Sequence, residues 1–205
     1  MTAVASLSEM LHERLENEAF VRVPAAWEEY LDLLEEPALR VEYLDHEIFC
    51  TMSYASHKHE IIVGNLIARL HSHFTRKGCG VLGSNRPTYI PSCGRSFQPD
   101  VTVVCGLPEL YPLRGEMNAY LNPAVVVEVL SRTTAEVDWA EKLPCYKDVL
   151  SLRHILFVES NRPYATLFSR NNDGNTWLNA DFRTPDDTIR LDDLALPMHD
   201  IYENA

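Results

Sequence analysis

The sequence predicts a mixed α/β domain, in which a central mixed sheet is flanked by helices. Apolar residues at helical spacing predict a long amphipathic helix over residues 57–78. Two runs rich in β-branched residues, at 98–104 and 123–130, are typical of buried strands. Helical and strand patterns also alternate along the chain, and this order favours one sheet with helices on its faces.

The N-terminal part of the chain is predicted to be helical. Apolar residues at helical spacing indicate an amphipathic helix within residues 7–20, and a second helix lies between Pro24 and Pro37. We expect residues 1–25 to form an N-terminal helical arm and residues 26–205 to form the main domain.

A β-hairpin follows in the segment "LRVEYLDHEIFCTM", where apolar and polar residues alternate on both sides of Asp45-His46. A two-residue hairpin turn needs positive φ angles, which Asp and His tolerate better than most residues. The next helix, "SHKHEIIVGNLIARLHSHFTRKG", has Ser53 or Ser56 as its N-cap and ends at Gly78.

The second half of the chain is predicted to be mostly strands. Short strands are expected at 81–82 and 88–90, before the buried strands at 98–104 and 123–130 and a loop at 106–116 between them. A helix over "DWAEKLPCYKDVL" precedes the hairpin formed by "HILFVES" and "YATLFSR", and "NNDGN" turns into a last strand at "TWLNA".

Composition limits the possible classes of protein. The chain has 205 residues, 46% of them hydrophobic, which suits one globular domain. It has neither an apolar run of the ~20 residues that a membrane span needs nor the basic, apolar start of a signal peptide. We therefore expect a cytoplasmic protein that does not bind membranes. Its five scattered cysteines, without a C-x-x-C pair, are predicted to be reduced thiols.

Two carboxylates lie in the apolar strand segments. Glu128 is in the middle of "PAVVVEVL", on the same face as Val126 and Leu130, and Asp100 opens the strand at 98–104. If the two strands are neighbours, the carboxylates converge and repel each other unless one is protonated or a divalent cation binds both. Oxygen ligands of this kind suit Mg²⁺ or Mn²⁺. Alternatively, Glu128 is a structural group that pairs with Arg132, Lys142 or backbone amides.

Two further patterns, an Asp–Lys pair and two pairs of histidines, contain residue types that are common at metal or catalytic sites. Asp138 and Lys142 share a helix face as an i, i+4 pair, directly after the Glu128 strand. The histidine pairs 57/59 and 71/73 do not predict a zinc site, because residues two apart on a helix point in different directions.

In combination, several segments resemble the Uma-type family of restriction-endonuclease-like proteins, a branch of the PD-(D/E)XK nuclease superfamily. They are "EYLDHEI", "SHKHEIIVGNL", "QPDVTVV", "VVVEVLSRTTAEVDWAEKLPCY" and "HILFVES". The resemblance extends from about residue 26 to 202. It implies a restriction-endonuclease-like core, with a central mixed sheet flanked by helices and an acidic pair at its centre.

The resemblance also implies roles for particular residues. Asp100 and Glu128 match the acidic residues of the two main motifs and, with the backbone carbonyl of Val129, would hold the metal. Lys142 matches a lysine from the following helix that replaces the usual one, because Leu130 stands two places after Glu128. Glu42 matches a further acidic position.

His59 matches a recurrent histidine, for which capping or packing is the alternative role. Two departures stand out. His46 replaces the glycine typical of the first turn, and Pro144 is expected to kink the helix beside Lys142 and to misplace its ammonium.

The resulting hypothesis is an Mg²⁺- or Mn²⁺-dependent endonuclease that acts on nucleic acid, DNA before RNA. Lys142 would orient and deprotonate the attacking water through a depressed pKa, or stabilise developing charge. The formal net charge of −12 is unfavourable for binding phosphates. A basic patch is therefore expected from a set of cations around the long helix and the loops after it: Lys58, Arg69, Arg76, Lys77, Arg86 and Arg95.

Two alternatives remain open. The first is a catalytically silent member of the family that self-associates as a homodimer through a sheet edge or the N-terminal helix. The second keeps the metal but acts on a small phosphoester, which relaxes the demand for positive charge.

Overall fold

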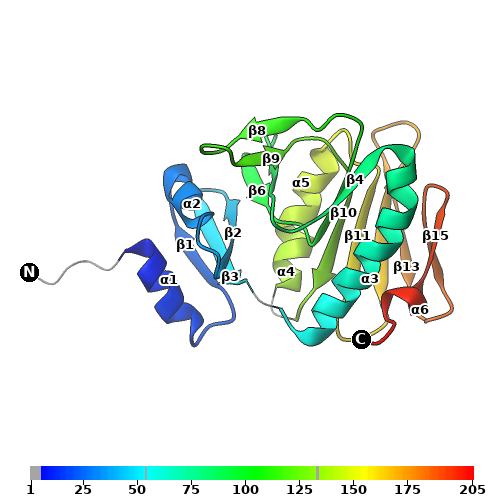
Figure 1. Cartoon of the computed structure of the whole chain (residues 1–205), viewed down its shortest axis with the longest axis horizontal. Helices are drawn as coiled ribbons and strands as arrows, with labels where there is room; N and C mark the ends of the chain where they lie inside the picture. Colours follow the sequence, from blue (N-terminus) through cyan, green and yellow to red (C-terminus); the bar gives the residue numbers. More distant parts are fainter. Residues whose placement is uncertain (1–5, 54, 133) are drawn as a thin grey trace, which may run out of the picture.

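The computed structural model describes residues 6–53, 55–132 and 134–205. Its central sheet has the strand order β13-β12-β11-β10-β7-β4. A second sheet has the order β1-β3-β2-β6-β5-β9-β8, and β14 and β15 form a separate hairpin. In the central sheet β10 is parallel to β11 and antiparallel to β7, so the predicted mixed sheet flanked by helices is confirmed (Figure 1).

The central sheet and the helices around it are formed by segments between residues 57 and 182. Their bounds are α3 (His57–Phe74), η1 (Thr75–Lys77), β4 (Cys79–Gly83), β7 (Val101–Cys105), β10 (Pro123–Leu130), α4 (Ala135–Val137), η2 (Asp138–Lys142), α5 (Leu143–Asp148), β11 (His154–Glu159), β12 (Ala165–Arg170) and β13 (Trp177–Phe182).

The second sheet and the chain ends contain the remaining elements. They are α1 (Leu7–Leu15), β1 (Val21–Pro24), α2 (Trp27–Leu33), β2 (Leu39–Leu44), β3 (Glu47–Met52), β5 (Thr88–Ile90), β6 (Arg95–Phe97), β8 (Leu110–Pro112), β9 (Asn118–Tyr120), β14 (Thr188–Leu191), β15 (Leu194–Pro197) and α6 (Met198–Ile201).

Strand β10 separates two hydrophobic cores, because every one of its residues is buried. Val125, Val127 and Val129 pack with the apolar face of α3, whereas Val126 and Leu130 pack with Tyr146 of α5 and its neighbours. The period-2 alternation that the sequence predicts therefore holds. It places Glu128 on the α5 side of the sheet.

The β2–β3 hairpin turns through Asp45 and His46, as predicted. Their φ angles are +48° and +65°, the left-handed values that a two-residue turn of this kind requires. The side chain of Ser56 caps α3 by accepting from the backbone N–H of His59, and Gly78, at φ +76°, follows η1.

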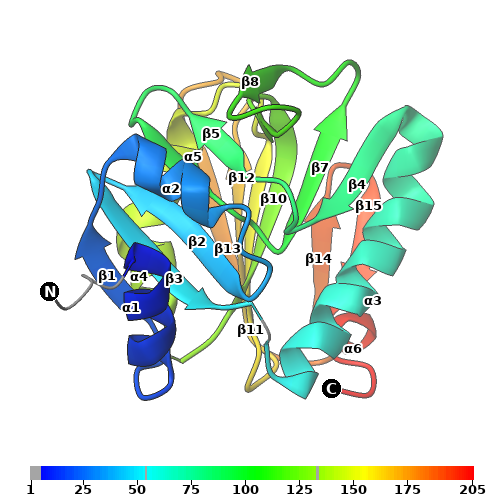
Figure 2. The same cartoon turned by 60° about the vertical axis from the view of Figure 1, so that its left-hand side comes forward.

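The N-terminal segment packs on the β2–β3 hairpin. β1 pairs antiparallel with β3, and Leu11, Leu15 and Val21 are buried in one cluster with residues of β2 and β3. Figure 2 shows α1 and β1 beside this hairpin, on the side of the molecule away from α3.

The prediction of reduced cysteines is wrong for two pairs. Cys79 of β4 and Cys105 of β7 are opposite each other in register and form a disulfide, and Cys93 is bonded to Cys145 of α5. The paired residues are 26 and 52 positions apart, so their contact depends on strand register and helix packing that cysteine spacing does not reveal. Disulfides are uncommon in reducing compartments.

Among the described residues, no helix is long and apolar enough to cross a membrane.

Candidate active site

A cavity of about 380 Å³ lies between the central sheet and the β2–β3 hairpin. The residues that the sequence singled out all line it: Glu42, His59, Asp100, Glu128, Val129 and Lys142. They come from β2, from the first turn of α3, from the approach to β7, from β10 and from η2. The fold therefore brings together residues that are far apart in the chain.

Asp100 is held from three sides. Its Oδ1 accepts from Arg40 Nη1 at 2.7 Å, and its Oδ2 accepts from the backbone N–H of Val129 at 2.7 Å. His59 Nε2 lies 3.3 Å from the same Oδ2. Burial acts to raise the pKa of Asp100, but Arg40, His59 and the Val129 N–H outweigh it and hold the pKa below its usual range. Asp100 is therefore a fixed, ionised carboxylate.

Glu128 is in a different electrostatic environment. Its Oε1 accepts from the hydroxyl of Tyr146 at 2.6 Å and lies 3.4 Å from Lys142 Nζ. Burial raises the pKa of Glu128 to about 8, because the attraction of Lys142 is offset by the nearby carboxylates of Asp138, Asp100 and Glu42. Below that pH the carboxyl of Glu128 is mostly protonated unless further positive charge is supplied.

Lys142 is enclosed by carboxylates. Its Nζ is 2.8 Å from Asp138 Oδ1, 2.9 Å from Glu42 Oε1 and 3.4 Å from Glu128 Oε1. Burial acts to lower its pKa, but these three neighbours outweigh burial and raise it well above the ordinary value. The depressed pKa predicted for Lys142 is therefore wrong for this state of the protein, and its side chain is an ammonium.

Pro144 does not misplace Lys142, contrary to the prediction. Residues 138–142 form a π-helical turn, in which the N–H of Leu143 bonds to the carbonyl of Asp138. Pro144 then stands in the first turn of α5, where a missing N–H is tolerated. The wide turn absorbs the proline and leaves Lys142 directed into the cavity.

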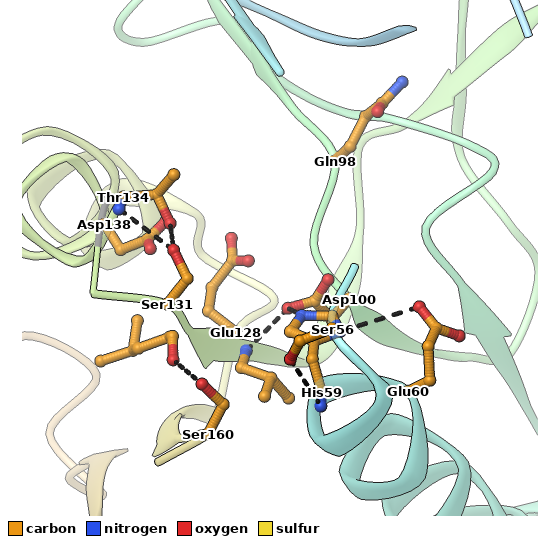
Figure 3. A network of polar contacts seen from close by, with 12 residues as sticks. Ser56, His59, Glu60, Gln98, Asp100, Glu128, Ser131, Thr134, Asp138 and Ser160 are labelled. Carbon is orange, nitrogen blue, oxygen red and sulfur yellow. Dashed lines mark hydrogen bonds and ion pairs between the residues drawn. The ribbon is translucent and has the colours of Figure 1, made fainter. Parts of the chain in front are cut away.

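His59 contributes both a capped backbone and a side chain at the site. Its backbone N–H completes the Ser56 cap, and its ring lies against Asp100 with 12% of the side chain exposed. Figure 3 shows Asp100 directly over this first turn of α3, with Glu128 between Asp100 and the helical segment that carries Asp138.

Sequence reasoning missed two residues that contact the acidic pair, Arg40 and Tyr146. Arg40 of β2 pairs with Asp100, and its Nη2 lies 4.0 Å from Glu128 Oε2. Its only signal in the sequence is its position two residues before Glu42, on the same face of the strand. Tyr146 follows Lys142 at helical spacing, which places both on one face.

The donor set fits a divalent cation by charge and by ligand type. Four buried carboxylates (Glu42, Asp100, Glu128 and Asp138) face two cations, Arg40 and Lys142, which leaves two uncompensated negative charges when all are ionised. Mg²⁺ needs only one or two carboxylates, because it keeps several waters. Among the described residues, however, no three His, Cys, Asp or Glu side chains are placed so that together they could hold a metal ion.

The predicted basic patch is not at the cavity. Arg69, Lys77 and Arg95 form ion pairs with Asp200, Asp193 and Asp45. Among the residues that the structure describes, the lysine and arginine side chains lining the cavity are Arg40 and Lys142, neither of which belongs to the predicted patch.

The segment at the end of α1 lines one side of the cavity. Leu15, Glu18 and Ala19 line it together with Phe49 and Met52 of β3. Residues near the start of the chain therefore contribute to the walls around Glu128 and Lys142.

Comparisons with known proteins agree with this architecture. The chain is 29% identical over 159 residues to the uncharacterized protein slr1290 of Synechocystis. This match covers 78% of this chain and 80% of slr1290. It is 26% identical over 131 residues to sll1609 of the same organism, covering 64% and 72%.

A solved structure from Anabaena variabilis, titled "a putative nuclease belonging to DUF820", superposes with a TM-score of 0.66 at 18% identity. The match covers 87% of this chain and 98% of that one, and it shows a common fold. Residues 27–198 match the Uma2 family, described as "Putative restriction endonuclease". With the match extending over most of the chain, this protein belongs to the Uma2 family.

Proposed function

We propose that the protein hydrolyses phosphodiester bonds of nucleic acid with an Mg²⁺ or Mn²⁺ ion held by Asp100, Glu128 and the backbone carbonyl of Val129. The observation that carries the proposal is the convergence of Asp100, Glu128 and Lys142 in one cavity that four buried carboxyl groups and two cationic side chains line. The family description supports phosphodiester chemistry.

The bound ion would acidify a water molecule and neutralise phosphate charge. The protein's own contribution comes from fixed groups around it. Lys142 presents an ammonium, held by Glu42 and Asp138, that stabilises negative charge developing on the phosphate. The Val129 N–H and His59 hold Asp100 in one orientation, and the Tyr146 hydroxyl does the same for Glu128.

Mn²⁺ titration by calorimetry tests the metal site. Wild type, Asp100→Asn and Glu128→Gln are compared with Asp192→Asn as the control, because Asp192 pairs with Arg153 and does not line this cavity. We expect about one ion per chain in wild type and in the control, and a loss of binding in both site variants. Absence of binding in wild type would overturn the proposal.

Cleavage assays with Mn²⁺ then identify the substrate. Labelled duplex DNA, single-stranded DNA, RNA and a small phosphodiester are compared, with Lys142→Met as the inactive reference. Cleavage of the small ester alone would replace nucleic acid by the small-phosphoester alternative.

A second candidate function is a silent interaction module that self-associates. One observation favours a silent site. Arg40 and Lys142 already pair with the buried carboxylates, so the protein itself supplies positive charge that a metal ion would otherwise supply. Sedimentation of wild type with and without Mn²⁺ distinguishes the two, because a silent module would form a stable dimer and bind no ion.

A further inference from the structure

Arg40 lies where a cation is needed between the two carboxylates. Its Nη1 donates to Asp100 Oδ1 at 2.7 Å, and its Nη2 donates to the carbonyl of Gln98 and lies 4.0 Å from Glu128 Oε2. We propose that Arg40 is a resident counter-cation that competes with the divalent ion for Asp100 and is displaced when the ion binds. This inference rests on the proposed metal site.

The contacts of Asp100 make the competition direct. The Val129 N–H and His59 engage Oδ2, and Arg40 engages Oδ1. An ion bound to Asp100 through Oδ1 would take the place of the guanidinium, since two cations repel strongly at contact distance. When both carboxyls are ionised in the metal-free protein, Arg40 offsets the repulsion between Asp100 and Glu128, which would otherwise destabilise the fold.

The structure also has space to receive the displaced side chain. Arg40 lines the active-site cavity and also a second cavity of about 420 Å³, which Asp100 and His59 line as well. Glu36 and Glu60 line this second cavity and would offer the guanidinium new partners. The Arg40 side chain is 24% exposed, so it is not locked in the core.

Calorimetric Mn²⁺ titration and thermal unfolding with and without Mn²⁺ test the inference on the full chain. Arg40→Met removes the competing charge, and Arg40→Lys keeps a charge but loses the two-point contact. Arg170→Met is the matched control, because the half-buried Arg170 guanidinium bonds only to backbone carbonyls, those of Lys147, Val149, Leu152 and Gly174, among the described residues.

We expect Arg40→Met to bind Mn²⁺ about tenfold more tightly than wild type, since it removes a positive charge from the ion's site. Its melting temperature without metal should fall, and Mn²⁺ should raise it by more than in wild type. Arg40→Lys should lie between the two proteins. Arg170→Met should lose stability but keep the wild-type affinity for Mn²⁺.

Each contrary result has a distinct meaning. If wild type binds Mn²⁺ and both Arg40 variants bind it equally or more weakly, Arg40 is not a competitor, and the metal site still stands. If neither wild type nor the variants bind, the metal site fails and this inference fails with it. Should Arg40→Met not fold without metal, the affinity of Arg40→Lys decides between these outcomes.

Discussion

The ammonium of Lys142 donates to a carboxylate oxygen of Glu42 at 2.9 Å, although the two residues are 100 positions apart in the chain. Glu42 belongs to the second sheet, whereas Lys142 belongs to the helical segment that follows β10 of the central sheet. Arg40 and Asp100 make a second ion pair between the same two parts. The candidate active site is therefore also a joint between the two sheets.

Replacing Lys142 should destabilise the protein. In Lys142→Met the buried carboxylates of Glu42, Asp138 and Glu128 lose their shared counter-charge, which should cost about 3–5 kcal/mol in the free energy of unfolding at pH 8. The cost should shrink toward pH 5.5, because burial raises the pKa of Glu128 and of Asp138, and these two carboxyls can then take up protons.

Urea unfolding at both pH values measures the effect of Lys142. Lys147→Met is the control, since Lys147 lies in the adjoining helix α5, over the ring of Phe168, and should contribute about 1 kcal/mol or less. An equal loss of stability at both pH values would show that lost packing, rather than uncompensated charge, explains the effect.

Metal affinity should depend on the ionisation of Glu128. Because burial raises the pKa of Glu128 to about 8, Mn²⁺ binding below that pH must displace a proton. Affinity should rise from pH 6.5 to pH 8 and level off above it. Calorimetry in buffers of different ionisation enthalpy would detect the released proton at pH 7, and a pH-independent affinity would contradict the expectation.

The stability of the metal-free fold should depend on pH in the opposite direction to the metal affinity, because of the same raised pKa of Glu128. The folded-state pKa of Glu128 lies above its unfolded value, so the folded protein binds the proton more tightly. The contribution of Glu128 to stability is greatest at low pH and is lost as the pH rises through about 8. Glu128→Gln should remove this contribution to the pH dependence, which urea unfolding between pH 5 and pH 9 would show.

A glycine at position 46 should stabilise the hairpin. His46 has a φ angle of +65°, a conformation that costs roughly 1 kcal/mol for a residue with a Cβ atom. His46→Gly removes this strain but loses the contact with the hydroxyl of Tyr43 at 3.3 Å. We expect a net gain of about 0.5 kcal/mol in urea unfolding. Gly78→Ala, at φ +76°, should have the opposite effect.

Pro144→Ala should leave the site intact. Pro144 is exposed and stands after the π-helical turn, so the turn does not depend on its missing N–H. We expect Mn²⁺ affinity within about twofold of wild type. A loss of affinity with preserved folding would show instead that the proline holds the π-helical turn and that Lys142 depends on it.

Local patterns were enough to predict part of this structure. The Asp45-His46 turn, helix α3 and the alternation along β10 depend on dihedral preferences and periodicity, which the sequence shows directly. Strands such as β6, β8 and β9 have three residues each, too few to establish a period, and they were not predicted.

The candidate site likewise has some residues that the sequence predicted and some that it did not. The strand and helix patterns predicted Asp100, Glu128 and Lys142 as candidate site residues, and the family resemblance added Glu42 and His59. The partners Arg40 and Tyr146 and the disulfide pairs depend on which strands and helices lie next to each other, which single-sequence patterns do not specify. The π-helical turn was missed for a related reason, since proline alone predicts a kink rather than an extra residue in the turn.

The double use of Lys142 and Glu42 has a consequence for how such a chain would change over evolutionary time. A descendant that lacked the proposed nuclease activity would still be under selection to keep both residues. Losing Lys142 leaves buried carboxyls without their shared counter-charge, and losing Glu42 removes one of the three carboxylate neighbours of the ammonium. A relative can therefore retain this pair for stability as well as for catalysis, so its retention alone does not indicate activity. Exchange of Asp100 together with Arg40, which removes both charges of that ion pair at once, would be the more informative sign that a lineage lacks the proposed activity.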